Sequence, residues 1–283
     1  MGSSLKSFFT FQQADNLTLN LGLYGILFFG DENFLSDAKP LASYTFNLED
    51  SFYFTMGYLD NENRHNMLDA LQREQLEYTR QIDYGFQVQM KNKYAYLDLW
   101  INWNLLNTPE HREYLDGGIN LYVYIYNFIF NLQRYWSHHG GTLFPSGPIK
   151  NNYSLALGLE NYYNLKYRVF NKIGYKIYYL AYDQQGTLTK RQGYGTLGEL
   201  YSYVLNFKLY CDFWYGNNFF TEEGNPLYQH SGSIFCGVRN ETRISEIADF
   251  IFEFRVHFLL DTGISGGEGR LELKSTFDYL IKE

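Results

Sequence analysis

Residues 81–103, QIDYGFQVQMKNKYAYLDLWINW, decide the fold. Apolar or aromatic side chains alternate with mostly polar ones from Ile82 to Met90 and, after the polar turn 91–93, again from Ala95 to Trp103. A period of two indicates β-strands, because successive side chains point to opposite faces of a strand. The stretch therefore predicts a hairpin whose two faces meet different surroundings.

Two kinds of protein provide such surroundings. In a soluble sandwich the apolar face packs on a second sheet, whereas in an outer-membrane barrel it meets lipid and the polar face lines the interior. The 283 residues include 28 Tyr and 24 Phe but only 5 Pro, and aromatic residues favour strands and form the girdles of membrane barrels. The mean hydropathy of −0.36 is compatible with a barrel, because half of each strand faces away from lipid.

Charge and apolar runs exclude other classes of protein. The formal net charge is −8 and no basic stripe is present, which argues against a nucleic-acid partner. No apolar run is long enough for a membrane-spanning helix. The first four residues carry no export signal, so the chain is either a mature form or not exported.

The alternating pattern recurs from residue 17 to the end of the chain, and long polar connections alternate with short ones. An up-and-down barrel produces this order, with long extracellular loops and short periplasmic turns. We predict one all-β domain over residues 1–283, a transmembrane up-and-down antiparallel β-barrel of about 14 strands with residues 1–16 as an N-terminal lead-in. Residues 60–80, 137–151 and 183–198 are predicted loops, the first with a short helix.

Charged side chains share the phase of the predicted inner face. Unpaired charges that face lipid are costly, so this common phase indicates a wet or salt-bridged interior. The interior is either an open channel, across which its basic side chains produce an electric field, or a packed core of paired charges that conducts no ions. The predicted pore-lining residues are Asp83, Asp98, Glu160, Lys166, Arg168, Lys176, Lys208, Asp212, Glu253, Arg255 and His257.

Candidates for chemistry are few. His138 and His139 are adjacent, and adjacent side chains on an extended chain diverge, so we expect an ordinary loop there rather than a metal or catalytic site. Ser137 beside His138 is not a nucleophile and base with an orienting partner. Cys211 and Cys236 are expected opposite each other on one hairpin, either bridged or free, and we expect two free lipid-facing thiols. We thus predict no enzyme activity, no metal and no cofactor.

Four stretches carry a resemblance to a known family. They are 96–104 (YLDLWINWN), 137–141 (SHHGG), 215–217 (YGN) followed by Phe219, and 224–229 (GNPLYQ). In this order they resemble a family of porins, outer-membrane β-barrel proteins of Bacteroidetes. The resemblance implies a location in the bacterial outer membrane.

These observations predict a porin-like channel for the passive diffusion of small hydrophilic solutes, with outer-membrane lipid and the solute as partners. An alternative is a structural or accessory barrel subunit of a secretion or glycan-uptake complex, with an outer-membrane protein as partner. A third reading is a soluble carbohydrate-binding β-sandwich, which the outward rows of Leu and Phe disfavour because they would form a large exposed apolar surface.

Overall fold

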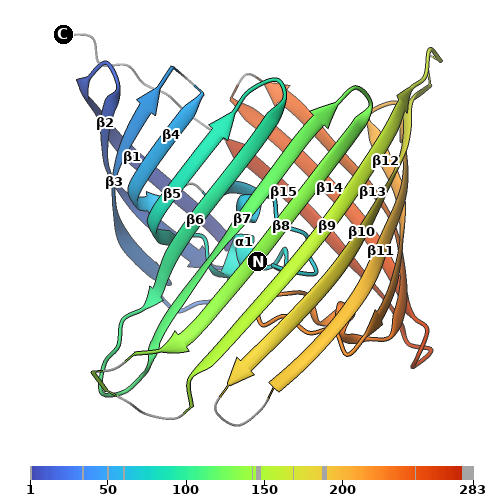
Figure 1. Ribbon diagram of the computed structural model, residues 1–283. Coiled ribbons are helices and arrows are strands. Elements are labelled where there is room, and N and C mark those ends of the chain that lie inside the picture. Colours follow the sequence, from blue (N-terminus) through green and yellow to red (C-terminus); the bar gives the residue numbers. More distant parts are fainter. Residues whose placement is uncertain are drawn as a thin grey trace. The chain divides into compact units, whose positions relative to one another are not determined.

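The computed structural model describes residues 2–33, 35–49, 51–59, 61–141, 143–144, 148–167, 169–186, 190–245 and 247–275. Fifteen strands form one sheet in which each strand is hydrogen-bonded to its neighbours in sequence, from β1 to β15 (Figure 1). Every strand pair with a described register is antiparallel. No helix of the described part is long and apolar enough to cross a membrane.

The strands are β1 (Gly2–Ala14), β2 (Leu17–Phe28), β3 (Asp37–Leu48), β4 (Phe52–Leu59), β5 (Asp83–Lys91), β6 (Ala95–Leu105), β7 (Glu113–Ile125), β8 (Phe128–Gly140), β9 (Lys150–Asn164), β10 (Phe170–Gly186), β11 (Lys190–Val204), β12 (Phe207–Asn217), β13 (Gly232–Ser245), β14 (Ala248–Leu259) and β15 (Ser265–Ser275). The short helices are η1 (Glu62–Asn66), α1 (Leu76–Thr79) and η2 (Pro226–Gln229).

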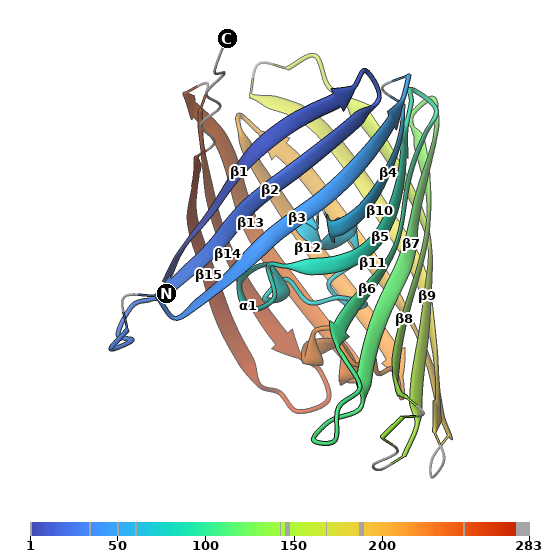
Figure 2. The ribbon, with the colours of Figure 1, turned by 90° about the vertical axis from the view of Figure 1, so that its left-hand side faces the viewer.

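The chain divides into two compact units. Unit 1 comprises Met1–Val123, Leu132–Tyr153 and Gln184–Lys190, and unit 2 comprises Tyr124–Asn131, Ser154–Asp183 and Arg191–Glu283. Within unit 1, Figure 2 shows β1, β2 and β3 side by side.

The β5–β6 hairpin of unit 1 confirms the prediction from residues 81–103. Its apolar side chains are exposed, with Phe86 at 42% and Ile101 at 42%, whereas Gln87 and Asp98 are buried. Phe86 pairs with Ile101, which places the exposed side chains of both strands on one face. A soluble protein buries its apolar face, so this reversal identifies the exposed face as the one that lipid covers.

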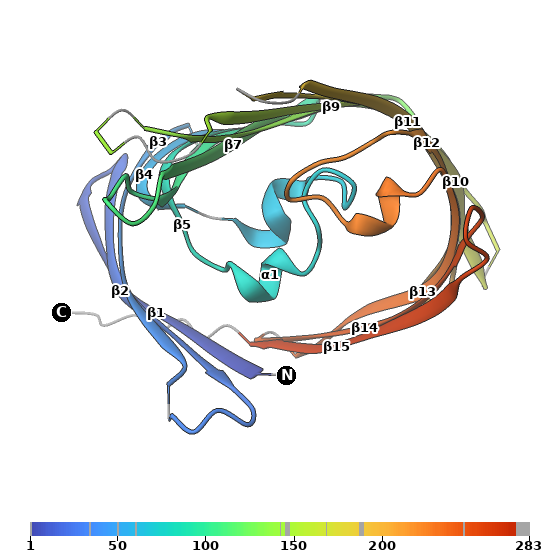
Figure 3. The same cartoon turned by 90° about the horizontal axis from the view of Figure 1, so that it is seen from below.

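Residues 61–82 of unit 1 fold onto the buried face of its sheet, as the view from below shows for the segment that carries α1 (Figure 3). Met67 and Leu71 are buried, and the backbone N–H of Leu68 donates to Gln133 Oε1 on β8. The predicted short helix in this connection is present, as η1 and α1. The polar face of the sheet is therefore covered by the chain itself in this unit.

In unit 2 the connection that carries η2 also packs on the buried face of the sheet. Trp214 of β12 lies edge-on to Phe219 and to Tyr228, with ring centroids 5.2 and 5.3 Å apart. Cys211 and Cys236 are paired residues of β12 and β13 and form a disulfide. The expectation of two free thiols is therefore wrong.

Several predicted boundaries differ from the observed ones. Residues 2–14 form β1 rather than a lead-in, which raises the strand count from about 14 to 15. β11 begins at Lys190, and β8 continues to Gly140, so parts of two predicted loops are strands. These segments were predicted as loops because they are rich in polar residues and glycine. Such residues also occupy the ends of barrel strands, so composition does not distinguish the two. The alternation predicted to the end of the chain includes residues 276–283, which lie outside the described part.

Candidate functional site

Several predicted pore-lining residues lie on the buried faces of the two units. In unit 1, Asp83 and Asp98 are 2% and 1% exposed. In unit 2, Lys176 and Lys208 share the Glu199 carboxylate at 3.1 and 2.9 Å, and Glu160 accepts a hydrogen bond from Tyr201. These acidic and basic groups are thus paired rather than free.

The remaining predicted residues divide into two sets. Asp212, Glu253 and Arg255 are buried, and His257 is half-buried with its ring 6.4 Å from that of Phe235. Lys166, however, lies in the exposed turn after β9. The prediction for Lys166 extended the strand alternation past Asn164, where β9 ends. Arg168 lies outside the described residues.

Unit 1 holds a buried polar cluster around His65, a residue that the sequence analysis did not select. Its Nδ1 lies 2.9 Å from Asp98 Oδ2 and its Nε2 lies 3.7 Å from Asp83 Oδ2. The imidazole stacks on Trp100 with the ring centroids 3.9 Å apart, and Arg80 contacts Asp116 at 2.7 Å. Because His65 is 1% exposed, this cluster anchors residues 61–82 and offers no access to a substrate.

The histidines of the predicted 137–141 loop lie on strand β8, on opposite faces. His138 belongs to the exposed face, where its Nδ1 lies 2.6 Å from Asn151 Oδ1 of β9. His139 stacks on Tyr114 with the ring centroids 4.2 Å apart. Their divergence follows from the alternation of a strand, and no group of three or more potential metal ligands occurs among the described residues.

Unit 2 carries an imidazole–carboxylate pair at the end of the sheet where the long connections lie. His230 follows η2 and Asp261 lies in the β14–β15 turn, and His230 Nδ1 is 3.1 Å from both carboxylate oxygens. The backbone N–H of Ser231 donates to Asp261 Oδ2 at 3.1 Å. Both side chains remain about 30% exposed, so water reaches them.

The carboxylate of this pair is held ionised. Partial desolvation raises the pKa of Asp261, but the hydrogen bonds from the Ser231 N–H and from His230 outweigh it and keep the pKa below its usual value. A fixed carboxylate at Nδ1 selects the tautomer in which Nε2 accepts a proton. His230 and Asp261 therefore have the geometry of a general base with its orienting partner.

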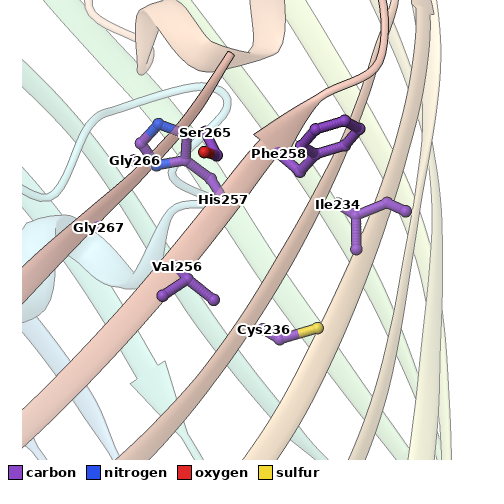
Figure 4. A pocket seen from close by; sticks show the side chains of 8 residues that line it. All are labelled: Ile234, Cys236, Val256, His257, Phe258, Ser265, Gly266 and Gly267. Atoms are coloured by element: carbon purple, nitrogen blue, oxygen red, sulfur yellow. The ribbon is translucent and has the colours of Figure 1, made fainter. Parts of the chain in front are cut away.

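An open apolar pocket of about 420 Å³ lies on the exposed face of the same strands, β13 to β15. Figure 4 shows its lining, in which Ile234 and Phe258 come from neighbouring strands. It continues along the strands, past Cys236 and Val256, and Gly266 and Gly267 border it without side chains. Phe258 is three residues before Asp261 in the sequence, and β14 ends between them at Leu259. We call this pocket the β13–β15 furrow.

Sequence reasoning missed this arrangement for a physical reason. His230 and Asp261 are 31 residues apart, and neither has a chemical partner nearby in sequence. Their approach depends on the ladder that pairs Ser233 with Leu259, which local patterns do not reveal. A signal was nevertheless present, because the alternation predicts strands near 231–239 and 250–260, and His230 and Asp261 directly flank them.

Solved structures similar to this chain are outer-membrane proteins. The chain resembles in-vitro folded OmpT, an outer-membrane protein of Vibrio cholerae, at 8% identity and TM-score 0.54, over 91% of this chain and 79% of that one. It also resembles an anion-selective porin from Comamonas acidovorans at 9% identity and TM-score 0.54, over 95% and 87%. No curated protein matches the chain by sequence. The predicted fold and location are confirmed: the chain is an up-and-down β-barrel of the bacterial outer membrane.

The fold alone does not identify an activity, but a match to a family model indicates one. The model for the lipid A 3'-O-deacylase type matches residues 1–267. A deacylase is an enzyme, so the prediction that this chain catalyses no chemistry is wrong. Of the resemblance drawn from the four motifs, the comparisons support the outer-membrane barrel. Because the match spans nearly the whole chain, this protein belongs to the lipid A 3'-O-deacylase-type family.

Proposed function

We propose that the protein is an outer-membrane hydrolase that removes an ester-linked acyl chain from a lipid A-type glycolipid. The observation that carries the proposal is the His230–Asp261 pair, which combines a fixed carboxylate with a water-accessible imidazole. The pair flanks the ends of β13 and β14, two of the strands that carry the β13–β15 furrow. Membership of the deacylase-type family supports the same reaction.

In this reaction His230 Nε2 takes a proton from water while the water oxygen adds to the ester carbonyl carbon. Asp261 stabilises the imidazolium that forms. When the tetrahedral intermediate collapses, the carbon–oxygen bond to the sugar breaks and the imidazolium returns its proton to the departing alkoxide. The products are a free fatty acid and a sugar hydroxyl, so atoms and charges balance without a further reactant.

The furrow explains how a membrane lipid reaches this pair. The acyl esters of a glycolipid lie where the headgroup meets the hydrocarbon, which corresponds to the ends of the strands. An acyl chain that extends from His230 towards the membrane would lie along Ile234, Val256 and Phe258, whose apolar surfaces are complementary to it. Attack would then occur at the ester end of the bound chain.

The test is hydrolysis of purified lipid A by the detergent-solubilised protein, with released fatty acid quantified by mass spectrometry. We expect His230→Gln to lower kcat by at least about 100-fold, because a general base typically contributes that much. Asp261→Asn should lower kcat too, since it removes the carboxylate that stabilises the imidazolium.

His111→Gln is the matched control, because His111 is an exposed loop histidine whose ring is hydrogen-bonded to the Thr108 hydroxyl. Its variant should hydrolyse lipid A at the wild-type rate. Wild-type activity in folded His230→Gln would contradict the proposal, and loss of activity in His138→Gln instead would move the site to the His138–Asn151 pair.

A second function, passive passage of small hydrophilic solutes, is favoured by Lys176 and Lys208 on the buried face of unit 2. Planar-bilayer conductance of the purified protein tests it. An open pore predicts a steady current whose selectivity moves towards cations in Lys176→Glu/Lys208→Glu. The absence of current from correctly folded protein would contradict it and would leave hydrolysis unaffected.

A further inference from the structure

Arg134 is a charged residue on the face of β8 that lipid covers. Its neighbours Gln133 and Tyr135 are buried, and Arg134 itself is exposed, so its side chain belongs to the outward set. The other outward residues towards the start of β8 are apolar, namely Phe128, Phe130 and Leu132. An arginine on the lipid face of a barrel is destabilising at the bilayer midplane and less so towards the interface.

Nothing in the described part of the chain neutralises this charge. Arg134 makes no ion pair with a described carboxylate, and its contact is a cation–π interaction with Tyr153, the guanidinium carbon lying 6.0 Å from the ring centroid. Tyr153 is three residues from the start of β9, whereas Arg134 is six from the end of β8. The side chain therefore leans towards the long-connection end of the sheet, as a snorkelling arginine does.

The outward surface beyond Arg134 is polar and aromatic. Trp136 is the next outward residue of β8, and its ring centroid lies 6.0 Å from that of His138. His138 is in turn fixed by Asn151 at 2.6 Å. A tryptophan near the end of a barrel strand is typical of the membrane interface, where lipid phosphates lie.

We propose that Arg134, with the Trp136–His138–Asn151 rim above it, binds the phosphate of a glycolipid in the outer leaflet. A phosphate is the anion available at the depth that the guanidinium reaches, and arginine binds phosphate oxygens through paired N–H donors. The site is built in unit 1 alone and is independent of hydrolysis at His230.

The experiment is native mass spectrometry of the full chain in detergent, titrated with bis-phosphorylated lipid A, with dephosphorylated lipid A and with inorganic phosphate. We expect wild type to bind the phosphorylated lipid at least about fivefold more tightly than the dephosphorylated one, the typical effect of one basic residue near a charged membrane surface. Arg134→Gln should remove this preference. The control is Lys39→Gln, because Lys39 is exposed but has its own counterion, Asp37, at 3.3 Å.

Equal binding of the two lipids by wild type would overturn the proposal without recourse to any variant. An undiminished preference in folded Arg134→Gln would overturn it as well. Displacement of the lipid by millimolar inorganic phosphate would show a site for the free anion and would refute the assignment to a lipid.

Discussion

Two opposing effects act on the pKa of the His65 imidazole. Burial lowers its pKa, but hydrogen bonds and charge attraction from Asp83 and Asp98 outweigh the burial and raise the pKa to about 9. In the unfolded chain the pKa is about 6.5. The folded state therefore binds this proton more tightly, and the resulting stabilisation is complete below about pH 6.5 and disappears as the pH rises through 9.

This difference predicts a pH-dependent stability. Between pH 6.5 and 9.5 the free energy of unfolding should fall by roughly 3 kcal/mol, since each pKa unit corresponds to about 1.4 kcal/mol. Thermal unfolding in detergent, followed at a series of pH values, measures the effect. The His65→Gln variant should be less stable at pH 6 and should lack this step, and an identical pH profile in the variant would rule out His65 as its origin.

Gly267 offers a second test at single-residue scale. A Cβ at this position would meet Arg255 O at 3.6 Å and Val256 Cγ1 at 3.7 Å, which are ordinary contacts, so a side chain fits the fold and enters the furrow. We expect Gly267→Leu to lower kcat/KM for long-chain esters by about tenfold and to spare short-chain esters, as loss of a few buried methylenes does.

Gly269→Leu is the control for this variant. Gly269 follows Gly267 on the same face of β15, and its Cβ would have as much room, but it does not line the furrow. Equal effects of the two leucines on chain-length preference would show that the furrow does not hold the acyl chain.

At the scale of elements, the disulfide joins β12 to β13 across a loop of 25 residues. Closing a loop of this length in the unfolded chain is worth about 3.5 kcal/mol in the chain-entropy treatment. We expect Cys211→Ala/Cys236→Ala to lower the free energy of unfolding by about that amount. Urea unfolding of both proteins measures it, and alkylation without reductant should modify no thiol in the wild type.

Strands were predictable where two different environments flank them. In β5 and β6 the aliphatic side chains lie on one face and the carboxylate and amide side chains on the other, so alternation identified the strands and their lipid-facing side. Alternation failed at strand ends. Beyond Asn164 the sequence Leu165, Lys166, Tyr167 keeps the period but forms a turn, because a turn of mixed residues imitates the pattern and only the register of hydrogen bonds distinguishes the two.

For the whole molecule, the outward apolar rows predict that lipid is part of the folded environment. Phe254 lies within β14 and is 49% exposed. We expect Phe254→Arg to destabilise the protein folded in lipid vesicles by about 2–4 kcal/mol, the cost of arginine on the lipid face near the midplane. The control is Tyr126→Arg, since Tyr126 is a turn residue that is 96% exposed, and its variant should fold like the wild type. Denaturant titration in vesicles compares them.

The barrel and its location were predictable from the sequence, whereas its enzymatic character was not. Periodicity is a local property that each strand carries by itself, so it reveals which face meets lipid. Catalytic geometry belongs to residues that meet only after folding. The proposed pair His230 and Asp261 is 31 residues apart, and its one sign in the sequence is the place of each residue beside a strand end. Fold similarity does not supply it either, since one fold serves many functions.

The pairing of sequence neighbours in the described ladders has a consequence for how such chains can change. Because each described ladder joins two consecutive strands, duplication or loss of a whole hairpin leaves every other ladder intact and preserves the alternation of direction. A tight two-residue turn, such as Tyr126 with Asn127, connects the two strands of a hairpin directly, so the hairpin can be inserted or removed as one unit. Chains of this kind can accordingly gain or lose strands in hairpin units, which changes the number of strands in the sheet and leaves the remaining ladders in place.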